Sequence, residues 1–170
     1  LLTTSANLRD ALRAADLARM MVMPWLTLEV KEEGAEARVC VGFDLPLQRL
    51  VAHALPLHLV IHATLACIRK FGRTLRGSES GFIGVELKGP PVPQADKMEA
   101  FFGVPVTFNA QVDALRFHQN LLDQPLEGAF PALHEQAQFL AEQRLGREVR
   151  RQGVTAEIET LLTREPELLS

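Results

Sequence analysis

Cysteine is scarce in this sequence of 170 residues, and the two cysteines present, Cys40 and Cys67, lack the spacing of a metal or redox motif. Isolated thiols of this kind suit a reducing cytosol, so we expect a cytoplasmic protein. A reactive thiolate needs a neighbouring base or positive charge. The pattern favours two buried, inert thiols.

An excess of basic charge is also missing, because the formal net charge is -3 at pH 7. Proteins that hold nucleic acid usually show a basic patch or a high isoelectric point. Two local runs, residues 69–76 (RKFGRTLR) and 144–151 (RLGREVRR), could bind a phosphate or an anionic effector. The solvated end of a helix explains such runs more often. We therefore expect contact with DNA only through another domain.

Long hydrophobic runs are absent. The most apolar stretch, residues 55–68, is 14 residues long and contains two histidines, so it is too short and too polar to cross a bilayer. Residues 1–10 lack the basic start of a signal peptide. We expect no membrane association. Hydrophobic residues make up 47% of the sequence, which is enough for a packed core.

No catalytic motif stands out. His58 and His62 are four residues apart and share a helix face, but a zinc protease would have Glu in the place of Leu59. A metal site would need a third ligand, such as His53 or His118. Histidines that line a core or an effector cavity are simpler interpretations. We expect no catalytic residue, no metal and no cofactor.

The first half of the sequence alternates helical and strand patterns. Asn7 is a candidate N-cap for a helix over residues 8–21, and period-two runs at 26–30 and 37–43 predict a β-hairpin. Residues 46–72 read as a buried helix that Pro56 kinks or splits and Gly72 ends.

The second half adds further elements. The predicted elements are a strand at 82–89, a short helix at 94–103 ending at Gly103, a second hairpin formed by 104–108 and 112–117, a helix at 132–150 ended by Gly153, and a short helix at 156–162. The glycines of residues 81–84 (GFIG) indicate a bulge or a close backbone approach. The expected fold class is α+β, with an antiparallel or mixed sheet built from two β-hairpins plus one strand, and packed helices.

Residues 101–126, FFGVPVTFNAQVDALRFHQNLLDQPL, resemble the end of the N-terminal, arabinose-binding-type regulatory domain of AraC-type bacterial transcriptional regulators. The residues that carry the resemblance are Phe101, Phe102, Gly103, Pro105, Val106, Phe108, Leu115, Phe117, Leu121, Leu122, Asp123, Pro125 and Leu126. His134 and its neighbours resemble the next helix of that group, and the weaker likeness of earlier segments extends the resemblance over about residues 1–145.

The resemblance implies a domain organisation. Residues 1–150 are expected to form an effector-binding and dimerisation domain, trimmed at its N-terminal side, and residues 151–170 a linker toward an absent helix-turn-helix DNA-binding domain. The expected partners are a small-molecule effector of unknown class and a second copy of the chain. The helix at 132–150 is the candidate for dimer contacts.

Four residues are candidates to line the effector pocket: Trp25, His58, His62 and Arg69. They combine apolar surface with a few polar groups, as ligand pockets do. Two alternatives stay open, a structural dimerisation module without an effector and a small α+β enzyme. The enzyme would need a nucleophile or an acid–base pair, and the sequence offers none that stands out.

Overall fold

The computed structural model describes residues 2–44, 57–76, 81–93 and 95–164. The helices are α1 (Leu8–Val22), α3 (Leu57–Arg76), α4 (Ala95–Phe102) and α5 (Pro131–Arg164), with short 3₁₀ turns at Leu2–Thr4 and Gln119–Leu121. The strands are β1 (Leu26–Glu33), β2 (Glu36–Phe43), β3 (Phe82–Glu86), β4 (Val106–Thr107) and β5 (Asp113–His118).

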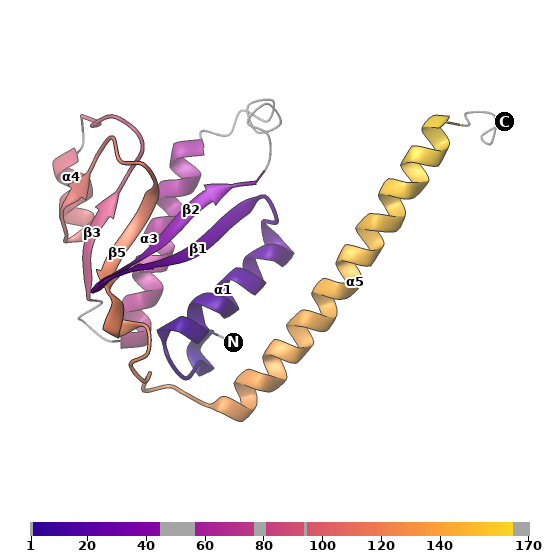
Figure 1. Ribbon diagram of the computed structural model, residues 1–170, viewed down its shortest axis with the longest axis horizontal. Helices are drawn as coiled ribbons and strands as arrows, with labels where there is room; N and C mark the ends of the chain where they lie inside the picture. The colour runs from indigo at the N-terminus through magenta and orange to yellow at the C-terminus, as the bar shows by residue number, and fades with distance from the viewer. Residues whose placement is uncertain (1, 45–56, 77–80, 94, 165–170) are drawn as a thin grey trace.

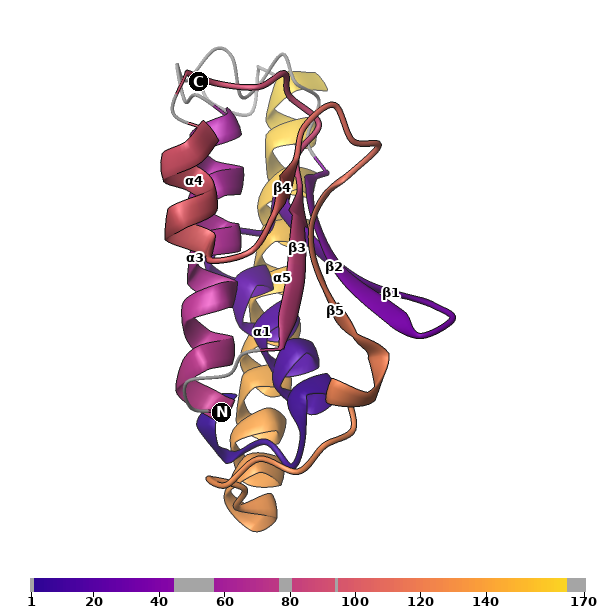
Figure 2. The same cartoon turned by 90° about the vertical axis from the view of Figure 1, so that its left-hand side faces the viewer.

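The five strands form one mixed sheet in the order β1-β2-β5-β3-β4. Figure 2 shows this sheet edge on, with α1, α3 and α4 on one side of it. The α+β class and the first hairpin, β1 with β2, are confirmed. In Figure 1, α5 passes beside α1 and then extends away from the sheet.

The second hairpin predicted from residues 104–117 is wrong. Strand β4 pairs in parallel with β3, whereas β5 lies between β2 and β3 and is antiparallel to both. The backbone amides of Asn109 and Ala110 donate to Gly89 and Leu87, so the turn crosses the end of β3. Alternation reveals which face of a strand is buried, but it does not identify the neighbouring strands.

Strand β5 is central because its apolar side chains meet the helices. Leu115 and Phe117 are 0% and 1% exposed. Two clusters share the core: one under α3 and α4 includes Leu65 and Leu115, and one under α1 includes Leu12 and Phe117. Burial of this apolar surface is the main term that holds the helices on the sheet.

The opposite face of the sheet is charged. Arg38 and Arg116 are directly opposite each other on β2 and β5, and Glu86 of β3 lies 3.7 Å from the first and 3.6 Å from the second. Glu36 pairs with Arg116 at 2.7 Å. The polar half of each alternating strand thus faces away from the helices.

Two predicted helix ends are wrong, although both helices exist. Helix α3 continues through Gly72 to Arg76, and α5 continues through Gly153 to Arg164, with no separate helix at 156–162. A single glycine costs about 1 kcal/mol in a helix, which packing and neighbouring helix formers can offset. The predicted start of the first long helix and its kink at Pro56 lie outside the described residues.

Other local predictions are confirmed. The Asn7 side chain accepts a hydrogen bond from the Asp10 amide and caps α1. Gly103 follows α4 with a φ of 64°. The register of β3 shifts between Phe82 and Gly84, as a bulge requires. These features depend on a few consecutive residues, which is why the sequence reveals them.

Candidate functional site

An apolar cavity of about 300 Å³ lies between α1, α3 and the sheet. Helix α1 contributes one wall and α3 the other, while Val39, Phe82 and Phe117 of the strands form the base. The cavity falls at the lower end of the size range of small-molecule pockets.

Small side chains create this space. Ala11, Ala15 and Ala18 of α1 face the cavity where larger residues would fill it. On the opposite wall Gly72 lets α3 approach the sheet, because a Cβ added there would lie 2.9 Å from Phe82 Cε2. The role of these alanines in lining a cavity becomes visible only in the structure, where α3 lies opposite them.

Few polar groups reach the cavity. Arg19 lies at its edge, where its Nε donates to Asp16 Oδ1 at 2.6 Å and its Nη1 donates to the Leu26 carbonyl. Thr64 Oγ1 donates its proton to the Val60 carbonyl at 2.8 Å. The Thr64 hydroxyl proton and the Arg19 Nε and Nη1 groups are thus already engaged, so the cavity suits a molecule that is mostly apolar.

The four pocket candidates from the sequence are not among the described residues that line this cavity. Trp25 stacks on Phe43 with ring centroids 5.7 Å apart and packs against the core under α3. Arg69 faces a different hollow, between α3 and the end of α4. The structure therefore brings only His58 and His62 together, and the role of all four in effector binding stays a prediction.

His58 and His62 lie on the N-terminal half of α3 with ring centroids 6.0 Å apart. Burial lowers the pKa of His62, and the neighbouring His58 lowers it further, which favours the neutral imidazole. Among the residues that the structure describes, no group of three or more His, Cys, Asp or Glu side chains is placed to hold a metal ion.

The two thiols differ. Cys40 is buried in β2, where burial raises the pKa of its thiol, as expected for an inert residue. Cys67 is exposed on α3 and lines the cavity rim, so the prediction that both thiols are buried is wrong for Cys67. The apolar run around it suggested burial, but position 67 faces outward on the helix.

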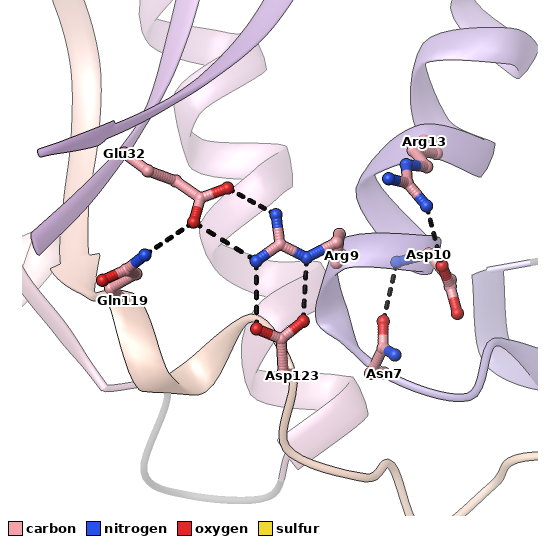
Figure 3. Close-up of polar contacts among 7 residues, drawn as sticks. All are labelled: Asn7, Arg9, Asp10, Arg13, Glu32, Gln119 and Asp123. Carbon is pink, nitrogen blue, oxygen red and sulfur yellow. Dashed lines mark hydrogen bonds and ion pairs between the residues drawn. The ribbon is translucent and has the colours of Figure 1, made fainter.

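A polar cluster joins α1 to the segment that follows β5 (Figure 3). Arg9 donates two hydrogen bonds to Asp123, at 2.8 and 3.0 Å, and also pairs with Glu32 of β1. Gln119 donates to the same Glu32 at 2.7 Å. No local pattern indicates this cluster, because Arg9 and Asp123 are 114 positions apart in the sequence.

Helix α5 exposes apolar side chains. Leu133 is 47% and Leu140 55% exposed, and they lie two helical turns apart on one face of the helix that the sequence analysis proposed for dimer contacts. Phe139, on another side, is 59% exposed. In contrast, Ala141 is buried on the side that contacts α1.

Comparison with known proteins defines the class of domain. Residues 1–126 match the arabinose-binding domain of AraC transcription regulators, N-terminal, and the chain belongs to that family. The family resemblance drawn from residues 101–126 is thereby confirmed.

A solved structure shares the fold. The crystal structure of the transcriptional regulator CdpR from Pseudomonas aeruginosa is similar, with a TM-score of 0.60 and 20% sequence identity over 94% of this chain. The chain spans about half of that relative, 52% of its length. The comparison with curated proteins gave no match. Within the described part of the chain, no helix has both the length and the apolar character needed to cross a membrane.

Proposed function

We propose that this regulatory domain binds a small, mostly apolar effector in the cavity between α1, α3 and the sheet. The observation that carries the proposal is the cavity itself, since its lining is almost wholly apolar and lies at the centre of the helical layer. The family supplies the regulatory context, and the protein that contains this domain is expected to act in the cytoplasm and to reach DNA through another domain.

Helix α1 offers a route from effector to output. It lines the cavity with Ala15 and Ala18, and it also packs against α5, where Ser5 before α1 lies 3.4 Å from His134. An effector acts only if it binds two states of the protein unequally. A ligand that separates α1 from α3 would favour one position of α1, and hence one arrangement of α5.

We also propose that α5 makes the contacts of a homodimer through the face that carries Leu133 and Leu140. Exposed apolar residues at a spacing of seven suit helix pairing, in which the same face of two copies packs together. The effector would then alter the geometry or the affinity of this dimer.

A thermal-shift screen of the chain tests the effector proposal. Decanoate and indole represent apolar ligands, and L-arabinose represents the polar sugar after which the family is named. A ligand at about 100 times its dissociation constant adds roughly 2.7 kcal/mol of stability. We expect saturable stabilisation by an apolar compound and none by arabinose.

The screen also separates the alternatives. A dimer that no compound class stabilises would favour a structural dimerisation module and contradict effector binding. An enzyme would need an activated catalytic group in the cavity, and the described lining residues include the Cys67 thiol but no carboxylate or histidine to activate it. The enzyme alternative therefore receives no support from this site.

A further inference from the structure

A second hollow, distinct from the apolar cavity, lies between the C-terminal half of α3 and the end of α4. It has a volume of about 520 Å³, and its lining includes Arg69, Lys70, Arg73 and Phe101. This basic hollow contains part of the basic run over residues 69–76.

The cations of the basic hollow have no acidic partner among the described residues: no ion pair joins Arg69, Lys70 or Arg73 to a carboxylate there. Glu99 of α4 forms no ion pair with these cations, and its Oε1 accepts a hydrogen bond from the Val106 amide at 3.1 Å. On α1 and in the sheet, by contrast, Arg9, Arg19 and Arg116 are each paired with a carboxylate. Unneutralised cations in one hollow attract an anion.

Arg69 is held in place before any ligand arrives. Its Nε donates to the Phe102 carbonyl at 2.7 Å, and its guanidinium lies 5.5 Å from the centroid of the Phe101 ring. Burial lowers the pKa of Arg69 and the charge of Arg73 lowers it further, as expected for two cations on one helix face. A fixed guanidinium loses little side-chain entropy when it binds an anion.

Phe101 adds a flat apolar surface beside these charges. Its ring is 54% exposed and is fixed by Phe102, which meets it edge to face with centroids 5.2 Å apart. An exposed ring next to a guanidinium can stack on a ligand ring. The hollow thus combines anion recognition with aromatic recognition.

We propose that the basic hollow binds a small aromatic anion, with its carboxylate or phosphate held by Arg69, Lys70 and Arg73 and its ring stacked beside Phe101. An aromatic carboxylate and a nucleoside monophosphate share this chemistry. The proposal is separate from the effector cavity, because the two sites share only Cys67 at their rims and are otherwise lined by different residues.

Isothermal titration of the chain with benzoate, adenosine 5′-monophosphate, adenosine and inorganic phosphate tests the proposal. Saturable binding of benzoate would indicate that the ligand is an aromatic carboxylate, and saturable binding of adenosine 5′-monophosphate that it is a nucleoside monophosphate. Phosphate has no ring to stack beside Phe101, and adenosine has no anionic group for the cations to hold. Each should therefore bind at least tenfold more weakly than the aromatic anion that binds. Binding should also weaken as NaCl is raised.

Variants assign the binding to named residues. Arg73→Gln should weaken binding roughly tenfold or more, as the loss of one charge-assisted hydrogen bond does, and Phe101→Leu should remove the preference for a ring over phosphate. Lys97→Gln, an exposed lysine of α4 that is not part of the lining, is the control and should bind as the wild type does. Both test positions are exposed, so the variants should fold.

Three results would overturn the proposal: no binding of either aromatic anion at 10 mM (a concentration on the order of the weakest specific affinities), phosphate binding as tight as theirs, or full binding by Arg73→Gln. None of these results bears on the apolar cavity, so failure here leaves the effector proposal standing.

Discussion

Arg9 holds Asp123 through two parallel hydrogen bonds, from Nε to Oδ1 at 2.8 Å and from Nη2 to Oδ2 at 3.0 Å. The pair joins the first turn of α1 to the Leu-Leu-Asp segment that helped to identify the family. The adjacent backbone is joined as well, since the Arg9 amide donates to the Leu122 carbonyl at 2.9 Å. Arg9 thus fixes the position of α1, the helix that lines one side of the apolar cavity.

The first prediction concerns acid. Hydrogen bonds from Arg9 lower the pKa of Asp123 and of Glu32, so both carboxylates stabilise the fold above their ordinary pKa values and lose this contribution as the pH falls through the lowered ones. Between about pH 5 and pH 3, the thermal midpoint of the wild type should therefore fall more than that of Arg9→Gln.

The control for the acid experiment is Arg13→Gln. Arg13 pairs with Asp10 at 3.4 Å, and its side chain is 74% exposed. Its charge is the smallest of the causes that lower the pKa of Asp123, so its removal should leave most of the acid response of the wild type in place. Differential scanning calorimetry over the pH series measures both variants. Equal acid responses of Arg9→Gln and the wild type would show that the pair adds nothing to stability.

The second prediction concerns Gly81, which precedes β3. Its φ is +65°, and a Cβ added there would lie 2.2 Å from Leu121 Cδ1. Gly81→Ala should lower the free energy of unfolding by at least about 1–2 kcal/mol, the cost of a left-handed conformation in a residue with a Cβ, measured by urea denaturation. Gly89→Ala is the matched control, since nothing lies within 4 Å of its added Cβ. Equal midpoints for the two variants would contradict this account.

The third prediction concerns the apolar cavity. Ala15→Leu should fill it and abolish stabilisation by an apolar effector, while leaving the protein as stable as the wild type or up to about 2 kcal/mol more stable, because added methylene groups become buried. Ala63→Leu, on an exposed position of α3 outside the lining, should leave the ligand response unchanged. Thermal shifts with and without ligand measure both effects, and a ligand response that survives in Ala15→Leu would place the effector elsewhere.

The fourth prediction concerns the dimer face. The double variant Leu133→Glu and Leu140→Glu should convert a dimer to a folded monomer, because it places charges on the proposed contact without disturbing a buried side chain. Light scattering coupled to size exclusion measures the mass. Phe139→Glu is the control, since Phe139 is equally exposed but lies about 100° round the helix from Leu140. A wild type that is monomeric at all concentrations would refute the dimer.

Local features of this chain could be predicted because each depends on neighbouring residues. Asn7 caps α1 through a contact three residues away, and Gly103 ends α4 through its own backbone conformation. The continuation of α3 past Gly72 could not be predicted, because it depends on packing against Phe82. The cavity was missed for the same reason, since Ala15 and Phe71 meet only across two helices.

By itself, the sequence determined the α+β class, the first hairpin, the buried faces of its strands and the family. Each of these follows from periodicity or from a short motif, and both depend on residues that are close together in the sequence. Only the tertiary structure decided that β5 lies between β2 and β3, that Arg9 donates two hydrogen bonds to Asp123, and that a cavity remains between α1 and α3. Those relationships join positions far apart in the chain, and it is the packing of the whole core that selects among the pairings that local patterns allow.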